Sequence, residues 1–150
     1  MSDPEIDRRY VKEYWEWRVK NHADEKRMIW YGNEWKWDAM EMITKNVLNT
    51  FGNCSVLEVA CGYGRHAELF DKDKYLGFDF SEEMIKLAKE KHPDYHFEVQ
   101  DANLFKPDKK YDIVFGVMAM GLVHKLSDYA NIAVIELSPS ETTIKFKDLT

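Results

Sequence analysis

The pattern of apolar and polar positions changes near residue 54. Before this point, apolar residues recur at helical spacing over residues 34–50, which predicts a helix there, and Asp3-Pro4 suits the start of an earlier helix over residues 3–21. After it, short apolar runs alternate with amphipathic stretches, a pattern typical of a parallel α/β sheet. We therefore expect a single domain, with a helical lead-in or lid over residues 1–52 and an α/β core over residues 53–150.

Five runs in the second part have the length and composition of strands. The run over residues 111–117 is almost wholly apolar, which predicts a central strand covered on both faces. Ser81 is a residue type that caps helix N-termini, and it precedes the clearest helical pattern. The expected strands are residues 55–60, 75–80, 95–99, 111–117 and 142–146, and the expected helices are residues 65–70, 82–92 and 126–137.

The stretch over residues 56–66 joins an expected strand to a glycine-containing loop. Gly62 and Gly64 suit a backbone that turns sharply or lies close to a ligand, since glycine has no Cβ. A strand, a glycine loop and a helix N-terminus place backbone N–H groups around a ligand at the carboxyl end of a parallel sheet. The stretch therefore predicts a site for a nucleotide-type cofactor.

Acidic residues stand at the ends of the next two expected strands. Asp79 is placed to accept hydrogen bonds from both ribose hydroxyls of an adenosine group. Asp101 is placed to accept one from the exocyclic amine of a base. A NAD site competes with this interpretation, because Gly62-x-Gly64-x-x-Ala67 also fits a dinucleotide fingerprint. Glu58 disfavours NAD, since its charge would repel a pyrophosphate but not a cationic ligand.

Taken together, the motifs over residues 56–124 resemble the class I S-adenosylmethionine-dependent methyltransferases. Val-Leu-Glu-Val-Ala-Cys-Gly-Tyr-Gly is similar to the family's first motif, with Ala60 in place of the first glycine. Tyr-Leu-Gly-Phe-Asp-Phe-Ser-Glu-Glu-Met resembles the second motif, Gln-Asp-Ala the third, and Tyr-Asp-Ile-Val-Phe-Gly-Val the fourth strand. The resemblance implies a Rossmann-like parallel sheet with flanking helices, here shortened to about five strands in the order 3-2-1-4-5.

The same resemblance implies S-adenosyl-L-methionine as cofactor and S-adenosyl-L-homocysteine as its product. Asp79 would bind the ribose, Phe80 and Met84 would lie beside the adenine, and Asp101 and the Ala102 N–H would bind the adenine edge. The implied cofactor-binding residues are Tyr14, Arg18, Trp30, Glu58, Ala60, Cys61, Gly62, Gly64, Asp79, Phe80, Met84, Asp101, Ala102 and Val117.

The N-terminal helix resembles the lead-in helix that closes over the cofactor in some small-molecule methyltransferases. Arg18 would then pair with the methionine carboxylate, and Trp30 or Tyr31 would face the sulfonium. The alternative for Arg18 is a surface ion pair with Glu13 or Glu16.

Other candidate residues also have plain structural alternatives. Asp79 could be a helix-capping acid and Asp101 a surface turn acid. Cys61 is most simply a small packing residue, since no base partner for a nucleophile is evident. The loop over residues 118–125 is apolar and suits either core packing or a pocket wall, with His124 as a candidate general base.

The predicted function is direct methyl transfer to a small-molecule acceptor. The alternative is a protein that binds or degrades S-adenosylmethionine, or a non-catalytic partner subunit, without an acceptor. The family's usual sheet has two further strands, whose absence would leave an exposed edge. We expect a second copy of the chain to cover that edge as a homodimer, unless the chain is a natural miniature or a truncated form.

Charge, hydropathy and cysteine spacing indicate which classes of partner are unlikely. The net charge of −6 makes a broad nucleic-acid surface unlikely, and no apolar run approaches the length of a membrane span. Cys54 and Cys61 are spaced for neither a zinc pair nor a disulfide framework, so we expect no metal and a reduced, cytoplasmic protein.

Overall fold

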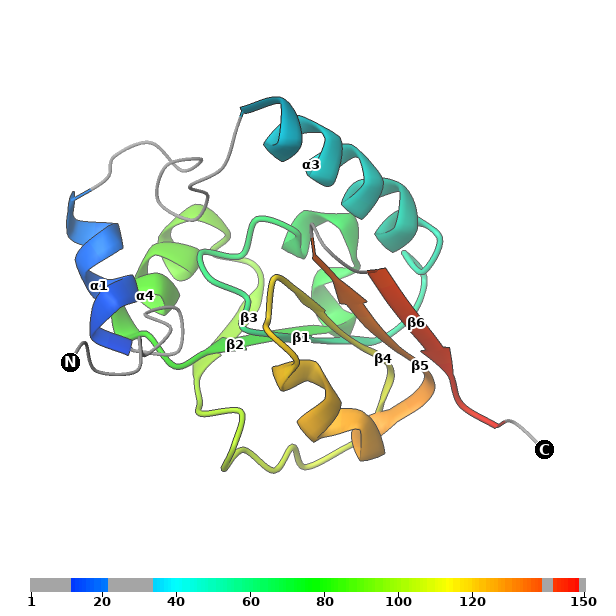
Figure 1. Cartoon of the computed structure of the whole chain (residues 1–150). Helices are drawn as coiled ribbons and strands as arrows, with labels where there is room; N and C mark the ends of the chain where they lie inside the picture. Colours follow the sequence, from blue (N-terminus) through cyan, green and yellow to red (C-terminus); the bar gives the residue numbers. More distant parts are fainter. Residues whose placement is uncertain (1–11, 22–33, 139–141, 149–150) are drawn as a thin grey trace, which may run out of the picture.

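The computed structural model describes residues 12–21, 34–138 and 142–148 (Figure 1). Its centre is a six-stranded sheet in the order β3-β2-β1-β4-β5-β6. The first five strands pair in parallel, and β6 pairs with β5 antiparallel. The strands are β1 (Val56–Val59), β2 (Tyr75–Asp79), β3 (His96–Val99), β4 (Tyr111–Val117), β5 (Ala130–Leu137) and β6 (Thr142–Phe146). The helices are α1 (Lys12–Asn21), α3 (Glu34–Asn49) and α4 (Glu82–Lys91), with the 3₁₀ helices η2 (Ala67–Leu69), η3 (Lys72–Lys74) and η4 (Leu122–Tyr129).

This architecture confirms the predicted Rossmann-like fold class and the N-terminal helical segment. The expected strands over residues 55–60, 75–80, 95–99 and 111–117 form within a residue of the expected bounds, and they lie in the expected order 3-2-1-4. Helices α3 and α4 also form where expected. Of the helix expected over residues 3–21, the part from Lys12 is described as α1.

Two expected helices were wrong. Residues 126–137 were expected to be helical, but they form the end of η4 and the strand β5. Strand β5 is buried along most of its length, and such a strand shows a continuous apolar run that periodicity cannot separate from a buried helix. The fifth position in the sheet is therefore β5, and the expected fifth strand over residues 142–146 is a sixth, antiparallel strand. Residues 65–70 hold only the single turn η2, and the backbone is already extended at Phe70, with φ −124° and ψ 161°.

The two faces of the sheet are covered differently. On one face, α3, α4 and η2 pack through Leu48, Ile85 and Ala67 against strand residues such as Phe115. On the other face, η4 packs through Val123 and Leu126 against side chains from β1, β2, β4 and β5. Figure 1 shows α3 above the sheet, the yellow-orange η4 below it, and α1 beside α4 at the left. The sheet is thus the middle layer, as expected where parallel strands need both faces covered.

Helix α4 illustrates how the sequence sets a local boundary. The Ser81 hydroxyl accepts a hydrogen bond from the Met84 N–H at 3.2 Å, which caps the helix as expected. Glu82 and Glu83 lie in the first turn and Lys89 and Lys91 in the last, so the side-chain charges complement the helix dipole at both ends. The helix start is therefore fixed directly after the end of β2.

Strand β6 forms one edge of the sheet. Phe146 is 68% exposed, although its ring lies 6.5 Å from that of Phe51. The exposed Lys145 stands between Ile144 and Phe146, and a charged side chain of this kind discourages strand pairing with other chains. The expectation that a second copy covers a sheet edge stays a prediction. None of the described helices is long and apolar enough to cross a membrane.

The burial of Leu48 makes a direct test of how α3 is held. Leu48 is 0% exposed, whereas Met42 on the same helix is 61% exposed. We expect Leu48→Ala to lower the free energy of unfolding by about 2–5 kcal/mol, because the substitution removes buried methyl groups and leaves a cavity. Met42→Ala is the matched control and should change it by no more than about 0.5 kcal/mol. Urea unfolding measures both, and equal effects would show that α3 does not pack as described.

Candidate functional site

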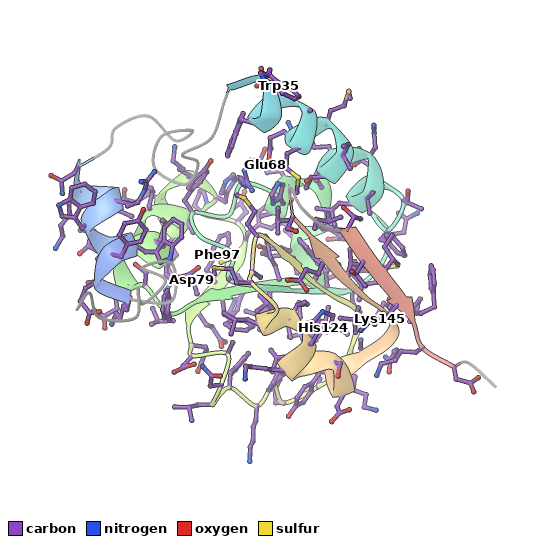
Figure 2. All side chains as sticks on the ribbon, viewed as in Figure 1. Trp35, Glu68, Asp79, Phe97, His124 and Lys145 are labelled. Atoms are coloured by element: carbon purple, nitrogen blue, oxygen red, sulfur yellow. The ribbon has the colours of Figure 1, made fainter. Side chains whose placement is uncertain are left out.

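The loops that follow β1 to β5 meet at one edge of the sheet. Because these strands are parallel, their carboxyl ends point the same way, and ligands of open α/β sheets bind along such an edge. The edge is formed by the glycine loop after β1, the β2–α4 junction and the loops after β3 and β4. In Figure 2, Asp79 lies on the α1 side of the sheet, and His124 lies in η4 below the sheet.

The glycine loop adopts a left-handed backbone at three alternate residues. The φ angles are +55° at Ala60, +56° at Gly62 and +79° at Gly64. A Cβ on Gly64 would also lie 2.6 Å from the Phe97 ring, so this residue needs glycine for both conformation and space. Ala60 has the same kind of conformation with a side chain, which costs roughly 1–2 kcal/mol. The first-glycine position of the motif thus keeps its glycine-like backbone although the residue is alanine.

Asp79 joins the glycine loop to the start of α4. Its Oδ2 accepts from the Gly62 N–H and its Oδ1 accepts from the Ser81 N–H, each at 3.0 Å. The side chain is buried, and burial raises its pKa to about 6, with the charge of Glu58 adding to the rise and backbone N–H donors opposing it. Asp79 therefore shapes the α4 junction, and its carboxylate lies at the carboxyl end of β2.

Cys61 is a packing residue in the described structure. It is 4% exposed, and a Cβ on Gly77 would lie 3.1 Å from its Sγ. Burial raises the pKa of the Cys61 thiol well above its ordinary value, and the charges of Glu58 and Asp79 raise it further. A thiol held in the protonated form is a poor nucleophile, which favours the packing interpretation.

Glu58 lies on the α3 side of β1 and is 2% exposed. Its Oε1 accepts from the Tyr75 hydroxyl at 2.6 Å, and its Oε2 lies 3.6 Å from His66 Nδ1. Glu58 stands opposite Gly77 in the β1–β2 register, and a Cβ on Gly77 would lie 2.5 Å from the Tyr75 hydroxyl oxygen. The missing side chain at Gly77 thus leaves room for Tyr75 to reach the neighbouring strand.

A chain of charged groups continues from Glu58 to α3. His66 is 1% exposed, and its Nε2 lies 3.4 Å from Glu41 Oε1. Arg65 Nη1 lies 2.7 Å from the same oxygen, in an ion pair without hydrogen-bond alignment, and the guanidinium stacks 4.7 Å from the Trp37 ring. Burial would raise the pKa of Glu41, but His66 and Arg65 outweigh it and lower the pKa. These contacts fix the end of the glycine loop against α3.

An open groove of about 600 Å³ lies beside the ends of β2 and β3. Its walls combine apolar side chains with one acidic turn. Val99 and Leu104 are 43% and 77% exposed, so both contribute apolar surface to the groove. The groove is lined by Lys12, Glu13, Phe80, Val99, Gln100, Asp101 and Leu104.

Asp101 forms a local turn at this groove. Its Oδ1 accepts from the backbone N–H of Asn103 at 2.8 Å and from the Asn103 side chain at 3.0 Å. Oδ2 has no hydrogen-bond partner among the described residues, and neither has the Ala102 N–H. The turn function and a ligand function are thus compatible, because different atoms serve them.

The other residues predicted to bind the cofactor do not all line the groove. Phe80 is part of the groove, whereas Met84 is buried against Tyr63 and lies near Gly62. Val117 is buried at the end of β4, in the core on the α3 side. Trp30 lies outside the described residues.

Helix α1 packs against the glycine loop and α4. Its Trp15 and Val19 contact the cluster formed by Tyr63 and Met84. Arg18 is 8% exposed, and its Nη1 donates to the Tyr14 hydroxyl at 3.2 Å. Arg18 is thus buried rather than on the surface, and its predicted pairing with a methionine carboxylate stays a prediction.

The loop after β4 is held by a residue that sequence reasoning missed. Glu136, on β5, accepts the Gly121 N–H with Oε1 at 2.6 Å, and its Oε2 lies 2.8 Å from His124 Nε2. Met118 and Met120 are left-handed at φ +54° and +57°, as is Gly121 at +82°. Glu136 was missed because its segment was expected to be helical. Apolar and polar residues do not alternate regularly over residues 130–137, so the sequence does not identify a strand there. The signal that could have pointed to Glu136 is an acidic residue within an apolar run.

Comparison with known proteins places the chain in a class. Residues 56–136, more than half of the 150, match the methyltransferase domain family. The chain belongs to this family. A protein of Invertebrate iridescent virus 6 named "Putative methyltransferase 235L" is 30% identical over 115 residues, which cover 71% of this chain and 43% of that protein. The chain thus spans less than half the length of this relative.

Two solved structures show the same fold. The magnesium protoporphyrin IX methyltransferase (ChlM) of Synechocystis PCC 6803 with bound S-adenosylmethionine has a TM-score of 0.60 at 16% identity, covering 90% of this chain and 77% of that one. The DhpI complex with S-adenosylhomocysteine has a TM-score of 0.63 at 18% identity, covering 83% and 66%. At these identities the likeness is one of fold. The predicted cofactor agrees with the ligands of both structures.

The strained backbone at Ala60 gives a test of the glycine loop. We expect Ala60→Gly to raise the free energy of unfolding by about 1 kcal/mol, because glycine relieves the left-handed strain at some cost in chain entropy. Ala39→Gly makes the same change at a half-buried residue inside α3, which has no positive φ, and should lower it by about 1 kcal/mol. Thermal unfolding compares the two. A loss of stability in both variants would refute the left-handed conformation at Ala60.

Proposed function

We propose that this domain binds S-adenosylmethionine along the carboxyl edge of its sheet and transfers the methyl group to a small-molecule acceptor. The observation that carries the proposal is the placement of Asp79, Phe80 and Asp101. These residues follow one another around the ends of adjacent strands, in a domain of the methyltransferase family.

The groove suits the adenosine part of the cofactor. Phe80, Val99 and Leu104 offer apolar surface for an adenine ring. The Oδ2 of Asp101 would accept from the exocyclic amine, and the Ala102 N–H would donate to a ring nitrogen. Asp79 would accept from the ribose hydroxyls at the end of β2.

The glycine loop and α1 suit the methionine part. Gly62 has open space at its Cα, where the nearest atom to a Cβ would be the Met84 sulfur at 3.9 Å. Backbone can therefore approach a ligand closely there, and Arg18 on α1 is the candidate partner of the carboxylate. Trp30 stays a candidate for the sulfonium. Glu58 would act indirectly, because its oxygens face Tyr75 and His66 and so fix the loop that precedes the glycines.

The chemistry is an in-line displacement at the methyl carbon. An acceptor lone pair forms the new bond, the C–S bond breaks, and its electron pair neutralises the sulfonium. Because a neutral thioether is a good leaving group, the protein mainly supplies proximity and orientation. Val117 and the loop after it lie where the β4 end faces this reaction in the proposed pose.

A second candidate is cofactor binding without an acceptor. The feature that favours it is Ala60, whose Cβ stands where the family's motif has glycine and so narrows the space for the methionine part. Incubation with S-adenosylmethionine followed by mass spectrometry separates the two. Methylthioadenosine or adenosine without a methylated compound would favour degradation, and a methylated acceptor would favour transfer.

The raised pKa of Asp79 gives a test that depends on pH. A carboxylate accepts hydroxyl hydrogen bonds better than a carboxylic acid, and the pKa near 6 means that most Asp79 is ionised at pH 7.5 and little at pH 5. The Kd for S-adenosylhomocysteine should therefore rise about tenfold from pH 7.5 to pH 5.0. Isothermal titration calorimetry measures it, with NAD as a ligand expected not to bind.

Two variants control this measurement. Asp79→Asn should bind more weakly at pH 7.5 and lose the pH dependence in this window. Asp94→Asn changes an exposed acid outside the proposed site and should behave as the unchanged chain. Unaltered affinity in Asp79→Asn would refute the ribose assignment, and tighter binding of NAD would refute the cofactor.

A further inference from the structure

A histidine and a carboxylate form a pair at the carboxyl edge, away from the adenosine groove. His124 lies in the first turn of η4 and Glu136 is the penultimate residue of β5. The His124 side chain is 37% exposed and that of Glu136 is 17% exposed. The pair therefore joins a half-exposed imidazole to a more deeply buried acid.

The hydrogen bonds of this pair fix which imidazole nitrogen carries the proton. Glu136 Oε2 lies 2.8 Å from His124 Nε2, and a carboxylate can only accept. In the neutral imidazole, Nε2 must then be the donor, so the lone pair is on Nδ1. His124 Nδ1 has no hydrogen-bond partner among the described residues. This is the arrangement of a base whose partner acid sets its tautomer.

The loop before His124 is folded back over the central strands. A Cβ on Gly116 would lie 2.5 Å from the Ala119 Cβ and 3.3 Å from the Val59 carbonyl oxygen, so Ala119 rests on β4 beside the end of β1. Val59 directly precedes Ala60 and the glycine loop. The loop over residues 118–121 thus lies next to the proposed methionine site, and the second oxygen of Glu136 holds it there through the Gly121 N–H.

We propose that Glu136 positions His124 to take the proton of a hydroxyl group on the methyl acceptor. This inference rests on the proposed methyl transfer. The hydroxyl oxygen attacks the methyl carbon, the C–S electron pair returns to sulfur, and the hydroxyl proton moves to His124 Nδ1. The resulting imidazolium is balanced by the Glu136 carboxylate. Met118, Met120 and Leu122 are only partly buried and give this loop apolar surface, which suits an acceptor with an apolar body, such as a phenol.

The substitution Glu136→Gln distinguishes the effect of Glu136 on the His124 imidazole from its effect on the loop backbone. The glutamine oxygen can still accept from Gly121, but its amide group would face His124 Nε2 as a donor. The neutral imidazole should then move its proton to Nδ1. Long-range ¹H–¹⁵N correlation spectra of the full chain at pH 8 report this tautomer, with His124→Gln used to assign the signal.

The expected result is an Nε2–H tautomer in the unchanged chain and a shift toward Nδ1–H in Glu136→Gln. Phenol, added with S-adenosylhomocysteine present, should shift the His124 signals saturably in the unchanged chain. This shift should be lost in Glu136→Gln. Anisole, which has the same ring without the hydroxyl proton, should not shift them.

A different result would contradict each of the three claims, which are cofactor binding, positioning by Glu136 and proton transfer to His124. Absence of S-adenosylhomocysteine binding would refute the proposed function itself. With that ligand bound, an identical tautomer in the unchanged chain and in Glu136→Gln would overturn the positioning by Glu136. An equal response to phenol and anisole, or none to either, would overturn proton transfer from a hydroxyl acceptor to His124.

Discussion

The carboxylate of Asp79 is the contact on which the candidate site depends. It crosses from the end of β2 to the glycine loop after β1 and to the first residue before α4, with both oxygens bonded to backbone N–H groups. Burying a carboxylate is costly, and the raised pKa near 6 shows that two backbone donors do not compensate fully. Further donors from a ligand, such as ribose hydroxyls, would therefore stabilise the ionised form. Asp79 thus orders the glycine loop and would itself be stabilised by hydroxyl donors of a ligand.

Glu58 shows how the structure changes an argument from sequence. The sequence placed an acid just before the glycine loop and suggested that its charge faces the ligand. In the structure this acid lies on the α3 side of the sheet, where both of its oxygens face Tyr75 and His66. Gly77 is the residue that permits this, because any side chain there would occupy the path of the Tyr75 hydroxyl. Repulsion between Glu58 and a pyrophosphate therefore no longer argues against NAD. The argument against NAD is now that the chain belongs to the methyltransferase domain family.

The sequence predicted the parts of the fold in which local signals agree with the tertiary structure. Ser81 with its acidic first turn marked α4, and the wholly apolar run over 111–117 marked the central strand. The prediction was wrong at strand β5, because burial on both faces removes the alternation of apolar and polar residues that identifies a strand. The same error concealed Glu136, which becomes informative only when β5 is known to lie beside the loop that carries His124. Contacts between Glu58, Tyr75 and His66 were equally out of reach, since they join residues from two strands and a turn.

Backbone strain gathers at the carboxyl ends of the two central strands. Ala60 follows β1, and Met118 and Met120 follow β4, all with positive φ and with side chains that disfavour it. At roughly 1–2 kcal/mol each, these three residues cost several kcal/mol in a domain whose net stability is of the order of 10. Such conformations persist only where neighbouring contacts hold them, here Ala119 against Gly116 and the Gly121 N–H on Glu136. Among the described residues, the non-glycine residues with positive φ all lie at this carboxyl edge, so the domain gives up stability where the proposed function needs an exact backbone position.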